Sequence, residues 1–159
     1  MKSMFNLRSS MSSAAVALLA TMAVASPAYA DRCDDLAAQL KGQIDGLKVG
    51  ITAAKIIYLS HPQAKEMSLG CFGRNFSNEL YVKADSRKPK PAFFELVASA
   101  AAIVFTVPKG DTLRGATRCI GRMGLLRGDR VTMRYRRLDL ECTRTKTEAA
   151  IAISRGKDE

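Results

Sequence analysis

The stretch RVTMRYRRLDLECT, residues 130–143, decides how this chain can fold. Apolar side chains alternate with polar ones in both of its halves: Val131, Met133 and Tyr135, and then Leu138, Leu140 and Cys142. Such alternation predicts β structure with one buried face. The apolar phase flips at Arg136-Arg137, so a continuous strand would leave one of the two sets in water. We therefore predict a long β segment with a bulge or a break at Arg136-Arg137.

Other parts of the chain also have the composition of strands. Residues 67–71 and 80–84 alternate in the same way, and residues 149–153 alternate near the end of the chain. Residues 51–59 (ITAAKIIYL) are rich in β-branched and aromatic side chains, which favour a strand. We expect the strands at residues 51–59, 67–71 and 80–84 to form a meander, and residues 155–159 to be a frayed charged tail.

Three segments have the spacing or composition of helices. In residues 31–48 the apolar side chains recur every three or four positions, and Gly50 is placed to close the helix. Residues 92–107 are alanine-rich and form the most apolar stretch after residue 30, which is typical of a central core helix that Pro108 and Gly110 end. The alternative, a membrane span, is less favoured because the stretch is short for a bilayer and contains Glu95, so we expect no stable membrane span after cleavage of the leader. Residues 111–126 are amphipathic.

Together these elements predict an α+β fold with the order α-β-β-β-α-α-β-β. An antiparallel sheet would pack against the helices in a small single domain. We find no internal repeat, no low-complexity tract and no sign of a second domain in the sequence.

The first thirty residues have the pattern of a signal peptide. Lys2 and Arg8 give a positive start, residues 14–25 are apolar, and the sequence PAYA at residues 27–30 ends in a small-x-small cleavage pattern. The apolar run is too short for a membrane span, which needs about 20 residues. We expect cleavage after Ala30, a folded domain over residues 31–159, and export to the periplasm or the medium, as is typical of a bacterial protein with such a leader.

The four cysteines all lie after the leader: Cys33, Cys71, Cys119 and Cys142. An even number of cysteines in an exported chain predicts disulfide bonds. Pairing of the nearer cysteines, Cys33 with Cys71 and Cys119 with Cys142, is slightly favoured. The main alternative pairs Cys33 with Cys119 and Cys71 with Cys142, and the sequence does not choose between them.

The basic residues include one ordered set. The chain has a formal net charge of +10, which attracts anionic surfaces, polysaccharides or acidic proteins. Arg114, Arg118 and Arg122 follow one another at i, i+4, i+8 in the helix expected at residues 111–126, and no acidic side chain is expected on their side of it. The opposite side of the helix is apolar: Leu113, Ala116, Cys119, Ile120 and Met123. The arginines are either a solvated helix face or a site for phosphate or carboxylate groups.

Residues that would carry catalysis or hold a cofactor or metal are scarce. His61 is the only histidine, stands beside Pro62 and is interpreted as a turn residue. No closely spaced cysteines, C-x-x-C, G-x-S-x-G, Walker loop, G-x-G-x-x-G or HExxH motif occurs. The sequence thus assigns no catalytic residue, metal or cofactor. Nucleic acid is not favoured as a partner, because no tryptophan is present and the basic stretches are not interleaved with aromatic residues that stack on bases.

Three functions follow from these observations as hypotheses. The first is an exported, non-enzymatic basic protein that binds an anionic partner through arginines. The alternative is a periplasmic scaffold or chaperone-like module that binds other proteins through an apolar groove. A hydrolase or a thiol enzyme is the least favoured of the three.

Overall fold

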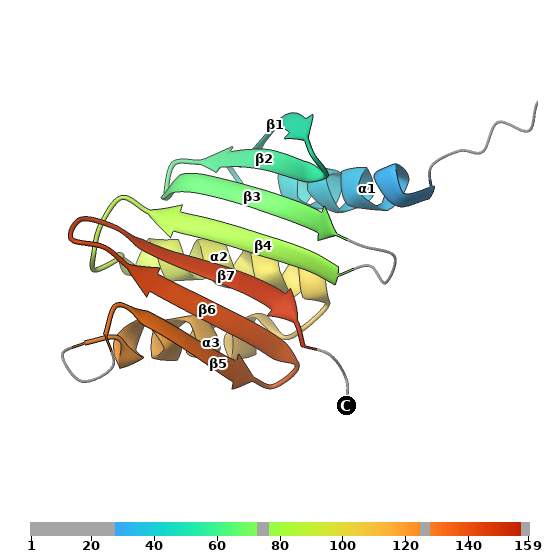
Figure 1. The fold of residues 1–159 in the computed structure, drawn as a ribbon. Helices are drawn as coiled ribbons and strands as arrows, with labels where there is room; N and C mark the ends of the chain where they lie inside the picture. The colour runs from blue at the N-terminus through green and yellow to red at the C-terminus, as the bar shows by residue number, and fades with distance from the viewer. Residues whose placement is uncertain (1–27, 73–76, 125–127, 157–159) are drawn as a thin grey trace, which may run out of the picture.

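One antiparallel sheet organises the molecule. The computed structural model describes residues 28–72, 77–124 and 128–156, and in these residues seven strands pair in the order β1-β2-β3-β4-β7-β6-β5 (Figure 1). The strands are β1 (Lys48–Ala53), β2 (Ile56–His61), β3 (Ala64–Phe72), β4 (Ser77–Ala84), β5 (Arg130–Tyr135), β6 (Leu138–Arg144) and β7 (Ala149–Arg155). The first four strands and the last three strands each form a meander, and β4 joins β7 at the centre of the sheet.

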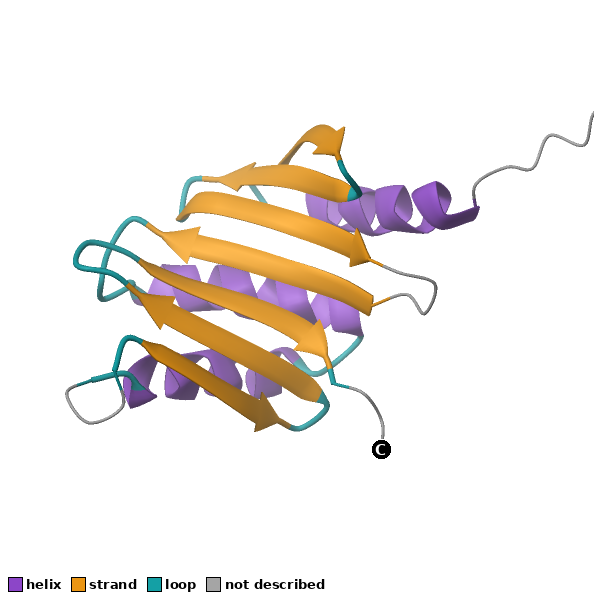
Figure 2. Ribbon diagram, viewed as in Figure 1, coloured by secondary structure: helices purple, strands orange, loops and turns teal. Residues whose placement is uncertain are grey.

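Three helices cover one face of this sheet. They are α1 (Ala28–Gln43), α2 (Pro91–Phe105) and α3 (Lys109–Arg122). Figure 2 shows that all three lie behind the sheet, with α1 behind the first strands, α2 behind the centre and α3 behind β5 and β6. The other face of the sheet carries no helix of the described residues.

The strand register explains why the helices lie on a single face. One buried row runs across six strands through cross-strand neighbours: Ile57, Leu69, Leu80, Ile153, Leu140 and Met133. The adjacent residues form a second row on the opposite face of the sheet: Tyr58, Ser68, Tyr81, Ala152, Glu141 and Thr132. Because side chains alternate between the two faces, each of these six strands contributes its apolar set to the helix side, whereas every residue of the edge strand β1 is exposed. The core therefore lies between the sheet and the helices.

The α+β class and the predicted order of elements are confirmed, and two predicted β segments prove to be hairpins. Residues 51–59 divide at Ala54-Lys55, where both φ angles are positive (49° and 66°), into the paired strands β1 and β2. The break expected at Arg136-Arg137 is a two-residue turn, because Tyr135 pairs directly with Leu138. The turn brings both apolar sets of residues 130–143 to the same face.

Three predicted boundaries are corrected. The first helix ends at Gln43 instead of residue 48, because Gly46 adopts a positive φ of 79° and Gly50 belongs to β1. The helix predicted at residues 111–126 ends at Arg122. The charged tail predicted from residue 155 begins later, because Arg155 is the last residue of β7. Residues 1–27, which include most of the expected leader, lie outside the described residues.

Two disulfides fasten helices to the sheet. Cys33 of α1 is bonded to Cys71 of β3, with their Cα atoms 6.4 Å apart, and Cys119 of α3 is bonded to Cys142 of β6, with a Cα separation of 6.0 Å. This is the pairing of nearer cysteines that the sequence slightly favoured, and the alternative pairing is excluded. Two such bonds indicate an oxidising environment for the folded protein.

Arginines from the last two strands bind the C-terminal ends of helices. The Arg144 guanidinium donates to the carbonyl oxygens of Ile120 (3.1 Å) and Met123 (3.4 Å) at the end of α3. The Arg155 guanidinium donates to the carbonyl oxygen of Phe105 (3.0 Å) at the end of α2. A helix C-terminus carries unpaired carbonyls and partial negative charge, so both contacts are electrostatically favourable.

Among the described residues, no helix is both long and apolar enough to cross a membrane.

The two disulfides should differ in their sensitivity to reductant. Cys119 and Cys142 are completely buried, whereas Cys33 and Cys71 are partly exposed. Because exchange requires access to a sulfur atom, a mild thiol reductant should open Cys33–Cys71 first. Alkylation at timed intervals and peptide mass spectrometry would measure this order. In denaturant the preference should disappear; simultaneous opening of both bonds in the native protein would contradict the difference in burial.

Candidate functional site

The arginines of α3 lie on its outer side. Arg114, Arg118 and Arg122 are exposed, and the Arg114 side chain retains 64% of its accessible surface. The opposite side of the helix is buried against the sheet and α2: Thr112, Gly115, Ala116, Cys119 and Ile120. The Thr112 hydroxyl lies 3.1 Å from the carbonyl oxygen of Ala98, which links α3 to α2. Three kinds of contact therefore fix the helix that carries the arginines: packing and a hydrogen bond to α2, the disulfide to Cys142, and hydrogen bonds from Arg144.

One acidic side chain does lie beside the arginines, which corrects the expectation that their side of the helix has none. An Asp111 oxygen is 2.5 Å from Nη2 of Arg114, one turn further along α3, and the other oxygen is 4.0 Å from Nε of Arg136. A hydrogen bond to Asp111, the largest cause, and a second hydrogen bond to Tyr135 raise the pKa of Arg114. Asp111 thus joins α3 to the β5–β6 turn.

Tyr135 packs between α3 and this turn. A β-carbon added to Gly115 would lie only 3.1 Å from Cδ1 of Tyr135, so the absence of a side chain at Gly115 lets the ring lie against the helix. The Arg118 guanidinium lies over the same ring, with Cζ 5.4 Å from the ring centroid. A cation over an aromatic face is attracted by the ring's electrons. Tyr135 thus lies against the helix backbone at Gly115 and beneath the guanidinium group of the exposed Arg118.

The β5–β6 turn adds two more arginines to those of α3. We call Arg114, Arg118, Arg122, Arg136 and Arg137 together the arginine surface. Within the described residues, Arg118, Arg122 and Arg137 have no carboxylate within 4.0 Å, whereas Arg130 and Arg134 of the adjacent strand β5 lie 3.3 and 3.9 Å from Glu141 and Asp139. The positive charge of the arginine surface is therefore only partly compensated, by Asp111.

A cavity of about 320 Å³ opens beside Tyr135 at the N-terminal end of α3. Its lining comes from the α2–α3 connection, from the start of α3 and from the β5–β6 turn: Thr106, Val107, Pro108, Asp111, Tyr135, Arg136, Arg137 and Leu138. Segments about thirty residues apart in the sequence thus meet here.

The backbone is strained at two places in the cavity wall. Thr106, which ends α2, has φ 53° and ψ 52°, and Arg136 has φ 59°. Positive φ values are uncommon for residues other than glycine, and a β-branched residue such as threonine is especially disfavoured there. The tertiary structure therefore imposes these conformations against local preference.

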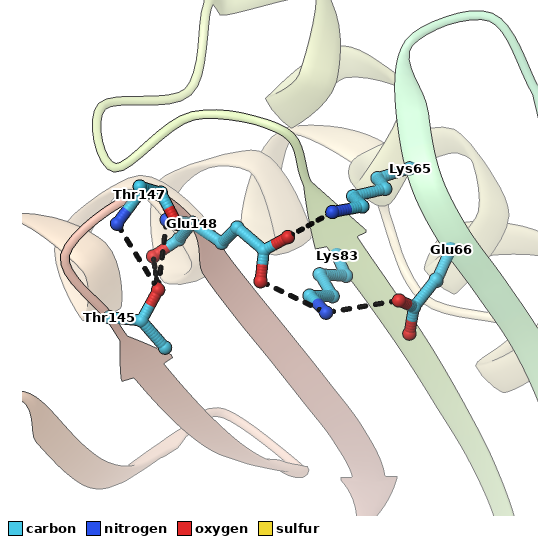
Figure 3. A network of polar contacts seen from close by, with 6 residues as sticks. All are labelled: Lys65, Glu66, Lys83, Thr145, Thr147 and Glu148. Carbon is cyan, nitrogen blue, oxygen red and sulfur yellow. Dashed lines mark hydrogen bonds and ion pairs between the residues drawn. The ribbon is translucent and has the colours of Figure 1, made fainter.

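A second polar cluster lies across β3, β4 and the β6–β7 turn (Figure 3). Glu148 binds Lys65 through one oxygen and Lys83 through the other (3.0 Å), and Lys83 also binds Glu66 (3.0 Å). Hydrogen bonds from Lys65 and Lys83 lower the pKa of Glu148, and hydrogen bonds to Glu66 and Glu148 raise the pKa of Lys83. Each charge in this cluster has an opposite charge beside it, so the cluster joins strands and leaves little charge for a ligand.

His61, expected in a turn, is instead the last residue of β2, pairs with Ala64 and flanks the β2–β3 turn. The backbone N–H of Gln63 donates to Nδ1 of His61 (3.1 Å), so Nε2 carries the proton and donates to the carbonyl oxygen of Asp45 (3.0 Å). Both ring nitrogens are thereby used in holding the β2–β3 turn against the α1–β1 connection. Among the described residues, no group of three or more histidine, cysteine, aspartate or glutamate side chains is arranged to hold a metal ion.

Sequence reasoning found the arginines of α3 and missed the other half of the site. The cavity, the two turn arginines as neighbours of α3, and the Asp111 contacts all depend on tertiary structure. One signal was available: Asp111 and Arg114 stand at positions i and i+3, a spacing at which side chains on a helix meet. Comparison with protein-family models, with curated proteins and with solved structures finds no match for this chain.

The substitution Glu148→Gln should lower the free energy of unfolding by an amount that depends on pH. Because the folded-state pKa of Glu148 is lowered, its contribution to stability is present above the ordinary glutamate pKa of about 4.3 and is lost as the pH falls through the folded value. The difference in unfolding free energy between the native protein and Glu148→Gln should therefore be largest near neutral pH and shrink in acid. Urea denaturation at pH 7, 4.5 and 3 would measure it.

A double-mutant cycle with Lys65→Met isolates the contribution of the Lys65–Glu148 pair. The interaction energy from this cycle should decline with the same pH dependence. A difference that stayed constant or grew in acid would show that Glu148 does not interact with these lysines as an anion.

Proposed function

We propose that this protein is an exported, non-enzymatic binding protein that holds an anionic partner against its arginine surface. The observation that carries the proposal is the incomplete pairing of that surface. Arg118, Arg122 and Arg137 have no carboxylate partner within the described residues, although carboxylates pair with arginines on the neighbouring strand β5. A guanidinium group is a planar donor that suits carboxylate, sulfate and phosphate oxygens.

The rigidity of the surface supports this function. The buried disulfide Cys119–Cys142 and the Arg144 contacts fix α3 to the sheet, and Asp111 and Tyr135 fix the helix to the β5–β6 turn. Arginines on such a support lose less conformational freedom when they bind than arginines on a free segment would. The domain expected after cleavage lacks Lys2 and Arg8 and keeps a net charge of +8 (10 − 2), which would in addition speed the encounter with an anionic partner.

Export is the second component of the proposal. The leader-like pattern of residues 1–30 supports delivery to the periplasm or the medium, and the two disulfides support an oxidising compartment. In that compartment the proposed anionic partners are anionic surfaces, polysaccharides and acidic proteins.

The alternative function, a module that binds other proteins through apolar contacts, has a separate observation in its favour. Ile51 of β1 and Tyr58 of β2 retain 73% and 48% of their accessible surface at the edge of the sheet furthest from α3. Partner binding at that edge would depend on apolar area and would respond little to salt.

Replacing Arg114, Arg118 and Arg122 by glutamine should weaken binding to a sulfated polysaccharide matrix. The triple variant should elute at lower salt and with a weaker dependence on salt, because fewer fixed charges release fewer counterions. Its unfolding free energy should change by less than about 1 kcal/mol, because all three side chains are exposed. Salt-gradient chromatography and urea denaturation measure the two effects.

A variant with the same change in net charge provides the control. Lys41, Lys48 and Lys55 are exposed lysines near the opposite edge of the sheet, and none forms an ion pair within the described residues. Their replacement by glutamine should shift elution much less than replacement of the three arginines. Equal shifts would mean that the matrix responds to total charge alone, and the proposed binding surface would be wrong.

A further inference from the structure

We propose that the cavity beside the arginine surface binds a small organic monocarboxylate with an apolar body. The inference rests on the proposed function, because it assigns a ligand class to one end of the same site.

The size and the lining suit a small amphiphilic molecule. A volume of about 320 Å³ lies at the small end of the range of about 300–1,000 Å³ for ligand pockets. Apolar groups come from Val107, Pro108, Tyr135 and Leu138, and charged groups come from the turn arginines and Asp111. A ligand with an acidic head and an apolar body can satisfy both parts of this wall at once.

The charge of the wall favours a single negative charge. Two arginines and one aspartate line the cavity, so the lining carries one net positive charge. The cost of removing an ion from water rises steeply with its charge, and one net positive charge leaves half of the charge of a dianion, such as a phosphate monoester, uncompensated. Arg137 has no carboxylate partner within the described residues and is therefore available to pair with a carboxylate.

The strained turn supports a specific role for the arginine at position 136. Of the two turn residues, Arg136 alone has a positive φ, which is the pattern of a type II′ turn and favours glycine at this position. An arginine here brings its charge to the cavity at the expense of the preferred turn chemistry. Strained residues often cluster at ligand sites, but Ala54 and Lys55 have positive φ at the far edge of the sheet, so the strain at Arg136 supports the proposal only together with its place in the cavity wall.

Octanoate is the probe for this proposal, and isothermal titration calorimetry is the measurement. Hexanoate, heptanoate and octanoate should bind with affinity that rises up to about fourfold for each methylene that enters the apolar part of the cavity. Octylammonium and 1-octanol have the same body without the negative charge and should bind at least about tenfold more weakly than octanoate. Octyl phosphate, as a dianion at pH 8, should bind more weakly than octanoate.

A pair of glycine variants separates charge from folding. Arg136→Gly and Lys55→Gly each remove one positive charge and one non-glycine residue with positive φ from a two-residue hairpin turn. Both variants should be at least as stable as the native protein, because glycine adopts positive φ without strain. Arg136→Gly should lower octanoate affinity about tenfold or more, and Lys55→Gly, at the far edge of the sheet, should leave it unchanged.

Failure of this proposal can be told apart from failure of the proposed function. Absence of octanoate binding, equal binding of 1-octanol, tighter binding of octyl phosphate, or equal effects of the two glycine variants would each overturn the carboxylate cavity. Retention on the sulfated matrix through α3 would survive any of these results. If the native protein bound octanoate but was not retained on the sulfated matrix through its arginines, the larger arginine surface would be rejected and the carboxylate cavity would stand.

Discussion

The structure depends on one constraint, which is that the sheet has a single apolar face. The row from Ile57 to Met133 crosses six strands on the helix side, and its neighbours on the other face are small or polar apart from two tyrosines. Burial of each such leucine or isoleucine is worth about 1.5–3 kcal/mol, so the three helices must all cover that side. The disulfides then fasten the two outer helices, α1 and α3, to strands of the same sheet.

This constraint also produces the candidate site. The helix α3 lies behind the edge strand β5 and its neighbour β6, at the border of the molecule (Figure 1). Its apolar side is buried and its arginines are exposed, so its polar side faces away from the sheet. The β5–β6 turn lies at the level of the N-terminal end of α3, where Asp111 reaches Arg136. The arginine surface and the cavity are consequences of packing an amphipathic helix under a hairpin whose turn is itself basic.

Periodicity made the strands and helices predictable, and turn chemistry made the hairpins hard to see. Alternation of apolar residues indicated the strands around Leu69, Leu80 and Ile151, and helical spacing placed the exposed arginines of α3 opposite Ile120. The turns at Ala54-Lys55 and Arg136-Arg137 lack the glycine or asparagine that usually marks two-residue hairpins, although both contain positive φ angles. For Arg136-Arg137 the change of apolar phase revealed a break; for residues 51–59 no such change was recognised, so one strand was predicted where two exist.

Tertiary contacts account for what the sequence could not indicate. The guanidinium groups of Arg144 and Arg155 bind helix ends more than twenty residues away, and such contacts have no local pattern. The cavity is similar, because residues 106–111 and residues 135–138 become neighbours only after α3 has packed on the sheet. The alternation that assigned Tyr135 to the buried side was sound, but it gave no indication that the ring lies at Gly115 and beneath Arg118.

The central claim is that anions bind at the α3 and β5–β6 end of the molecule. Backbone amide chemical shifts of the isotope-labelled protein, followed during titration with a sulfated oligosaccharide, test this most directly. The largest shifts should cluster at residues 114–122 and 135–138 and diminish as salt is added. Shifts centred instead on Tyr58 and Tyr81 of the uncovered sheet face, or spread evenly over every basic residue, would contradict it.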